Sequence, residues 1–402
     1  MHSNTRPSDS YSPLYFLAAL GAGGLVVTFF MWLMFWIPHP GQPVPVFENI
    51  AAAFAAGGLG VKAMIAAAMA GIAGFAILHV RSLIWNLRRM AEWRRTDAFA
   101  KFVRTNAQSQ LMAAPLAVAM AVNVGFILGM VFVPGLWSVV EYLFPLAMIA
   151  FLAIGVWAFR VYGGFIGRVL TEGGFNCAAN NNFGQILPAF AFSMVGVGLS
   201  APAALSTTPA IAGTGLVLST FFLVTAVLIA GVALILGIRS MMENGANAET
   251  APTLMIIVPL VTVLGILTLR QDHGLHEHFG AVAVAGESLA WLAKLVSVQV
   301  IFGLFGMMIL ARQGYAKRFL FGAENSPGSY ALVCPGVGFA VMMHFFINKG
   351  LVEAGLLAKF GLGFWALTAM ALASQAAMIW LVLHLNRRHF GAPRPAVAVP
   401  AE

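Results

Sequence analysis

The chain has 402 residues, of which 60% are hydrophobic and only 9% are charged, whereas soluble domains carry about 25% charged residues. So few charges cannot cover a surface that faces water, which excludes a soluble protein. Two cysteines, Cys177 and Cys334, are too few for a disulfide framework, and we interpret both as packing thiols. The composition therefore predicts an all-α integral membrane protein.

Ten apolar segments are long enough to cross a membrane, since about 20 residues span the hydrocarbon. The polar start lacks the pattern of a secretory signal. We expect an N-terminal tail at 1–12, a transmembrane pore domain at 13–386 and a C-terminal tail at 387–402. The predicted spans lie near residues 13–37, 59–86, 109–133, 136–160, 184–206, 209–240, 252–270, 281–312, 328–348 and 356–386.

The cations are distributed unevenly between the two predicted faces. An even number of spans puts both termini on one side, and 17 of the 22 Lys and Arg residues fall on that side. The positive-inside rule makes this side cytoplasmic. Arg270, Lys349 and Lys359 are predicted at the opposite face. The formal charge of +8 follows from this topology, so no nucleic-acid partner is expected.

Two sets of residues recur with the period of one helical hairpin. The even-numbered spans end near Arg81, Arg160, Arg239 and Arg312, which are separated by 79, 79 and 73 residues. Such a period predicts five tandem hairpins related by an axis along the membrane normal. The odd-numbered spans share the second set, a helix-breaking position at Gly21, Pro115, Pro188, Pro259 and Pro335.

Proline inside a helix removes a hydrogen bond and bends the axis, and in lipid the freed carbonyl should face protein or water. We therefore expect an inner ring of kinked odd-numbered helices around a central pore. Those helices carry no ring of acidic side chains, which favours small anions over cations. The candidate anion contacts are Asn123, Ser193, Thr262, His344 and Asn348.

A phenyl ring that projects into a pore of small residues would block it, and rotation of the ring would open it. The candidate gates are Phe190, Phe192 and Phe339, each two or four residues after a repeated proline. Lys294, seven residues after Glu287 on an even-numbered span, is interpreted as half of a buried ion pair rather than as a selectivity charge.

The tandem hairpins, the kinked odd-numbered spans and the uncharged pore resemble the tellurite-resistance and dicarboxylate permease family (TehA-like), which includes the plant slow anion channels. The resemblance covers residues 13–386 and implies one pore per protomer, a phenylalanine gate and a trimer, with a dimer as the alternative homo-oligomer. It also implies a bacterial inner-membrane protein that passes chloride, nitrate, dicarboxylates or sulfur oxyanions such as sulfite and thiosulfate.

Two other functions remain open at this stage. One is an ion-coupled anion exporter or importer, and the other is a membrane anchor of a haem or quinone redox enzyme, for which His79, His344 and His384 are the candidate ligands. The chain has neither a nucleotide-binding loop nor a nucleophile elbow, so we expect no enzyme activity and no cofactor.

Two polar segments carry weaker signals. The stretch "QDHGLHEHFG" gathers His273, His276 and His278 with acidic residues, but we interpret it as a polar outer loop rather than a metal site. Residues 86–107 alternate cations with aromatic residues, which predicts an interfacial amphipathic helix that contacts membrane lipid.

Overall fold

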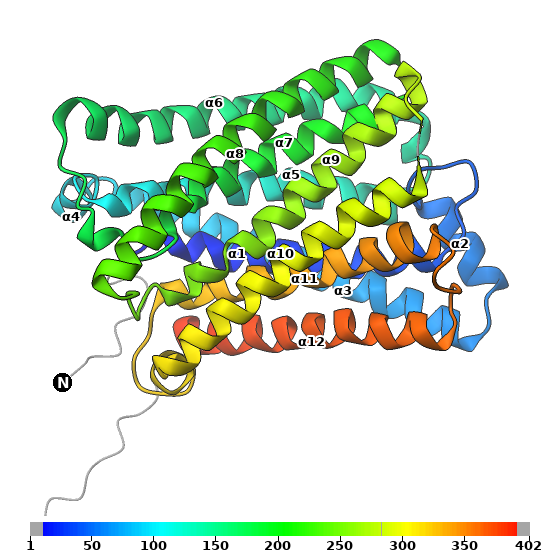
Figure 1. Cartoon of the computed structure of the whole chain (residues 1–402). Helices are drawn as coiled ribbons and strands as arrows, with labels where there is room; N and C mark the ends of the chain where they lie inside the picture. Colours follow the sequence, from blue (N-terminus) through cyan, green and yellow to red (C-terminus); the bar gives the residue numbers. More distant parts are fainter. Residues whose placement is uncertain (1–10, 283, 392–402) are drawn as a thin grey trace, which may run out of the picture.

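The computed structural model describes residues 11–282 and 284–391, and this part of the chain is helical without any strand (Figure 1). Ten of its helices are long and apolar enough to cross a membrane, as the sequence predicts. Most of both predicted tails, residues 1–10 and 392–402, lies outside the described residues. The long helices are α1 (Phe16–Trp36), α3 (Leu59–Trp93), α5 (Ala113–Phe132), α6 (Val140–Glu172), α7 (Leu187–Leu205), α8 (Pro209–Asn244), α9 (Ile257–Phe279), α10 (Ala285–Arg312), α11 (Val333–Phe345) and α12 (Leu362–Phe390).

The long helices differ sharply in burial. The most apolar windows of α1, α5, α7, α9 and α11 are between 61% and 94% buried, whereas those of α3, α6, α8, α10 and α12 are between 22% and 39% buried. We call the first set the inner helices and the second set the outer helices. A helix that is hydrophobic all round is stable in lipid as well as in a protein core, so burial rather than composition separates the two sets.

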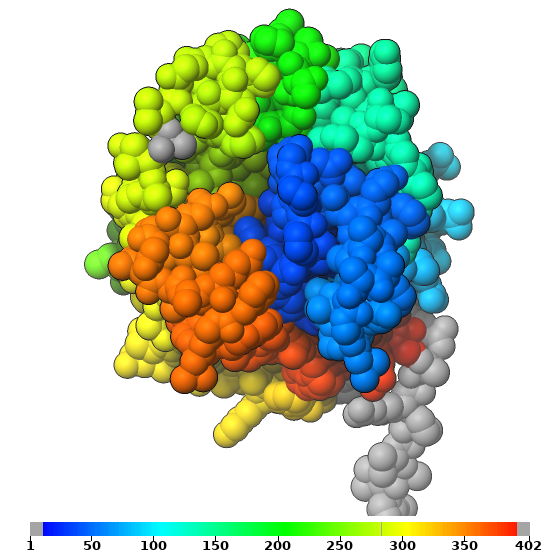
Figure 2. Space-filling model, turned by 90° about the vertical axis from the view of Figure 1, so that its right-hand side faces the viewer, coloured from blue at the N-terminus to red at the C-terminus, as the bar shows by residue number. Residues whose placement is uncertain are grey.

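The inner helices contact one another in a closed cycle. α1 packs against α5, α5 against α7, α7 against α9, α9 against α11, and α11 against α1. Each inner helix also packs against the outer helix that follows it in the chain. Figure 2 views the end of the bundle where each inner helix connects to its outer helix. These connections follow one another around this end in chain order, from blue through teal, green and yellow-green to orange. The fold is therefore closed by contact between its first and last inner helices.

Every inner span begins as a 3-10 helix before it becomes α-helical. These starts are Pro13–Tyr15, Asn106–Met112, Gly184–Ile186, Ala251–Met255 and Pro327–Leu332. The repeated prolines occupy the second or third position of the α-helix that follows. A proline is tolerated in the first turn of an α-helix because its fixed φ of about −65° already suits the helix. The predicted break is therefore a change of helix type at the start of the α-helix, and not an interruption in its middle.

The first and last helices meet at one end of the bundle, which we call the terminal end. The Tyr15 hydroxyl lies 3.1 Å from His389 Nδ1, and the Tyr330 hydroxyl donates to Asn386 Oδ1 over 2.8 Å. At this end α3 continues to Trp93, and the short helix α4 (Asp97–Phe102) follows. The predicted amphipathic segment 86–107 is therefore divided between the end of α3 and α4.

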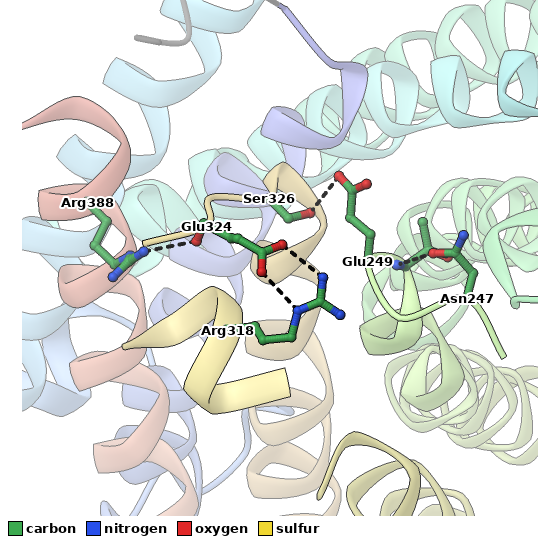
Figure 3. A network of polar contacts seen from close by, with 7 residues as sticks. Asn247, Glu249, Arg318, Glu324, Ser326 and Arg388 are labelled. Carbon is green, nitrogen blue, oxygen red and sulfur yellow. Dashed lines mark hydrogen bonds and ion pairs between the residues drawn. The ribbon is translucent and has the colours of Figure 1, made fainter. Parts of the chain in front are cut away.

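Figure 3 shows a polar network that joins the connections at the terminal end. Arg318 makes a bidentate ion pair with Glu324, with Nε–Oε1 and Nη2–Oε2 distances of 3.0 and 2.9 Å. Arg388 of α12 donates to the Glu324 carbonyl, and Ser326 donates to Glu249 ahead of α9. The hydrogen bond with Glu324 raises the pKa of the Arg318 guanidinium. This network fixes α12 to the connections that precede α9 and α11.

Close approach of α7 and α9 depends on Gly274. A Cβ at this position would overlap the backbone carbonyl of Ala203, which cannot move aside as a side chain could. We expect Gly274→Ala to destabilise the protein by about 1–3 kcal/mol, the usual cost of overpacking. The measurement is thermal unfolding in detergent, monitored as the loss of the monodisperse peak in size-exclusion chromatography.

The matched control is Gly231→Ala in the middle of α8, where an added Cβ meets no atom within 4 Å. This change should leave the unfolding temperature unchanged or raise it slightly, because alanine is the better helix former. Equal unfolding temperatures for the two variants would contradict the predicted contact.

Candidate functional site

A cavity of about 200 Å³, which we call the axial cavity, lies between the inner helices and extends to α6. All five inner helices contribute side chains to its wall. Near the end opposite the chain ends, Val44 of the first connection and Trp137 ahead of α6 also line it. In Figure 2 the dark blue residues of α1 and the start of this connection reach the centre of that face. Residues from the inner helices include Gly21, Asn123, Phe190, Thr262, Arg270 and Cys334.

A smaller cavity of about 30 Å³ lies toward the terminal end. It is lined by the first turns of α1, α7, α9 and α11 and by polar residues that include Gln110, Asn182 and Thr253. Three residues, Phe190, Pro259 and Cys334, line both this cavity and the larger one. They therefore form the partition between the two cavities, which we call the constriction.

Of the three predicted gate residues, only Phe190 lies at the constriction. Its side chain is 3% exposed. Phe192 instead packs away from both cavities, with its ring centroid 4.5 Å from that of Phe159 in α6 and 6.2 Å from that of Phe222 in α8. Phe339 packs against a separate cluster that contains Met343 and Phe364. The geometry therefore distinguishes Phe190 from two residues that the sequence could not separate from it.

The predicted anion contacts divide in the same way. Asn123 and Thr262 line the larger cavity, whereas Ser193, His344 and Asn348 do not. The Thr262 hydroxyl donates to the Val258 carbonyl and accepts from Gln299 over 2.6 Å. The Asn123 amide nitrogen donates to the Ala119 carbonyl over 3.2 Å. The amide oxygen is then the atom of this side chain that can accept a hydrogen bond.

The repeated positions also differ in their exposure to the cavities. Gly21 and Pro259 line them directly, whereas Pro115, Pro188 and Pro335 are buried among neighbouring helices. An added Cβ at Gly21 would approach Val333 of α11 at 2.8 Å. Gly21 therefore permits the contact between the first and last inner helices, in addition to its place in the cavity wall.

The sequence prediction missed Arg270. We expected it at the outer membrane face and did not name it as a site residue. α9 continues nine residues, or about 13 Å, past Arg270 to Phe279. Its guanidinium donates to the Val197 carbonyl of α7 over 2.7 Å and lines the larger cavity. No acidic side chain lines either cavity, and no ion pair involves Arg270 among the described residues. A positive charge without a carboxylate partner therefore lies on the axis of the bundle.

The stretch "QDHGLHEHFG" was wrongly predicted as a loop, because its first nine residues complete α9. The helix ends at Gly280, whose φ of 72° is the left-handed conformation of a C-terminal cap. His276 donates to the Ala281 carbonyl and His278 to the Ser206 carbonyl, each over 2.8 Å. Within the described residues, no group of three or more His, Cys, Asp or Glu side chains is placed to hold a metal ion.

The three membrane histidines have separate environments. His79 donates to the Ala19 carbonyl and His384 to the Leu320 carbonyl, each over 2.8 Å. His344 is buried beside Phe35 and Trp36, and neither of its ring nitrogens has a protein partner among the described residues.

The prediction that Lys294 belongs to a buried ion pair is wrong. Lys294 is exposed on α10, and it forms no ion pair with Glu287 or any other acid in the described part of the chain. On an outer helix an exposed lysine can extend its ammonium group toward the headgroups, so it needs no carboxylate partner.

Comparison of the chain with models of known protein families, with curated proteins and with solved structures gave no match.

The constriction can be tested through Cys334, which becomes the only thiol once Cys177 is replaced by serine. In that background we expect Phe190→Ala to accelerate labelling of Cys334 by a charged methanethiosulfonate about tenfold, which corresponds to a barrier lower by about 1.4 kcal/mol. The reason is that the missing ring joins the two cavities. Labelling rates of the purified protein provide the measurement.

Phe192→Ala and Phe339→Ala are the controls, since neither residue lines a cavity. Their labelling rates should match that of the parent. If all three variants accelerated labelling equally, the effect would reflect general loosening of the bundle and not removal of a partition.

Proposed function

We propose that the protein is a channel or channel-like permease that moves small anions along the axis of the five inner helices. The observation that carries the proposal is Arg270, whose unpaired positive charge lines a cavity without acidic side chains. A charge inside a membrane protein is costly and usually marks a pathway or a ligand site. A positive charge with no carboxylate nearby attracts anions and repels cations.

The two cavities supply the route in this proposal. They lie on either side of Phe190, Pro259 and Cys334, so a solute needs to pass only one constriction to move between them. The smaller cavity is lined by the first turns of four inner helices, whose positive dipole ends favour an anion. The electrostatic preference is therefore for anions on both sides of the constriction.

The repeated architecture supports the same assignment. We propose that each inner helix and the outer helix after it form one of five hairpin repeats around the pathway. The shared 3-10 start of the five inner spans, and the proline in the first turn of α5, α7, α9 and α11, support such a repeat. The excess of arginine at the terminal end supports a cytoplasmic location for that end.

The first experiment measures the selectivity of current through the purified protein in a planar bilayer under a salt gradient. We expect a reversal potential near the anion equilibrium value. Arg270→Gln should reduce the preference for anions over cations about tenfold or more, because one charge a few ångströms from the ion contributes about 1–4 kcal/mol. Substitution of chloride by sulfite, thiosulfate, nitrate and malate ranks the substrates.

Lys359→Gln is the matched control, because Lys359 is an exposed cation ahead of α12 that lines neither cavity. It should leave the preference unchanged. A cation-selective current, or equal effects of the two substitutions, would contradict the role of Arg270. Uptake of labelled anions into proteoliposomes without any current would instead favour a coupled carrier.

Phe190→Ala should raise the anion current, since a void replaces the ring at the constriction. Phe192→Ala is the control. Phe192 lies two residues later on the same helix but packs against Phe159 and Phe222, so the current of this variant should equal that of the parent protein. Current amplitude at fixed protein density, with the anion preference measured in parallel, is the readout. An unchanged current in Phe190→Ala would remove Phe190 as the gate.

A further inference from the structure

A long groove runs over the membrane-facing side of α3 and α5, away from the axial cavity. Its volume is about 1280 Å³. It is lined by residues on one face of α3, spaced every three or four positions from Ala73 to Glu92, and by the second half of α5. The groove is apolar along most of its length, and its charged residues all belong to the last part of α3.

The charges lie at one end of the groove. Arg81, Arg88 and Arg89 line it together with a single acid, Glu92, which is paired with Arg89 over 2.7 Å. The side chains of Arg81 and Arg88 are exposed, and no hydrogen bond or ion pair involves them among the described residues. Two unneutralised positive charges therefore stand at the end of an apolar groove.

The length of α3 locates these charges relative to a bilayer. Its 35 residues extend over about 52 Å, whereas the hydrocarbon core is about 30 Å thick and is crossed by about 20 residues. Counted from Leu59, the helix leaves the hydrocarbon close to Arg81. Arg88 then lies about 10 Å further along the same face, at the level of the lipid headgroups. Trp85, between them, is a residue type that prefers this interface.

We propose that this groove is a binding site for an anionic phospholipid. An acyl chain lies along Ile77, Val80 and Leu128, and the phosphate and headgroup contact Arg81 and Arg88. We choose a lipid over a soluble anion because the charges adjoin an apolar groove that an acyl chain can occupy. We choose an anionic lipid over a zwitterionic one because the two arginines have no other counter-charge among the described residues. The site is independent of the proposed transport activity.

The position of the groove gives the lipid direct access to an inner helix. Gly125, Leu128 and Gly129 of α5 line the groove, whereas Asn123, Ile127 and other residues of the same helix line the axial cavity. Only the thickness of α5 separates the two. An added Cβ at Gly125 would meet no atom within 4 Å, so the groove has room for a larger occupant at that point.

Retention of lipid by the purified full-length protein tests the proposal. Protein exchanged into mixed detergent with phosphatidylglycerol and phosphatidylcholine of identical acyl chains is analysed by native mass spectrometry. We expect preferential retention of phosphatidylglycerol. Arg81→Gln or Arg88→Gln should weaken that preference about fivefold each, and the double variant about 30-fold.

Two further variants separate the groove from general charge attraction. Arg160→Gln removes an exposed arginine at the equivalent position of the next repeat, outside the groove, and should leave retention unchanged. Gly125→Leu fills the apolar part without altering any charge and should reduce retention, whereas Gly231→Leu on exposed α8 should not.

Three outcomes would overturn the proposal. The first is equal retention of the two lipids by the parent protein. The second is full retention in Gly125→Leu despite loss in the arginine variants, which would indicate a surface charge effect without a seated lipid. The third is unchanged retention together with dissociation of an oligomer in Gly125→Leu, which would assign the groove to a second copy of this chain.

Discussion

The satisfaction of backbone hydrogen bonds inside the membrane is the constraint on which this structure depends. No water replaces a missing partner in hydrocarbon, so a proline can be placed only where the freed group is accommodated. Four inner spans meet this requirement for the repeated proline by starting as 3-10 helices and placing it in the first turn of the following α-helix, and α7 has a second proline, Pro202, near its other end. The same local solution recurs in four spans, whereas α1 lacks a proline and follows a 3-10 helix that begins with Pro13.

The level of this change in helix type is also the level of the constriction. Pro259 and Cys334 belong to the first turns of α9 and α11, and Phe190 lies on the fourth residue of α7. The partition between the cavities is therefore built where the inner spans are tied together by their 3-10 starts.

Much of the fold was accessible from the sequence, because apolar length and the recurrence of proline depend on local chemistry. Ten spans follow from hydropathy alone, and nine of their starts were placed within four residues of the observed ones. The sequence could not show which way the side chains of Phe190 and Phe192 point, because this depends on the rotation of α7 about its own axis within the bundle. Arg270 was missed because a polar run was read as a loop, although Gly280 marks the true end of the helix.

The isolation of Arg270 is the basis of the proposed preference of the axial cavity for anions. A carboxylate beside it would lower the cost of its burial but would also neutralise the field that an entering ion experiences. The Val197 carbonyl holds one end of the guanidinium, yet a single carbonyl carries only a partial charge and leaves most of the donors free. An anion or water must therefore accept the remaining hydrogen bonds of the guanidinium. The lack of protein acceptors makes the burial of Arg270 costly to the fold, and it also makes the group available to a ligand.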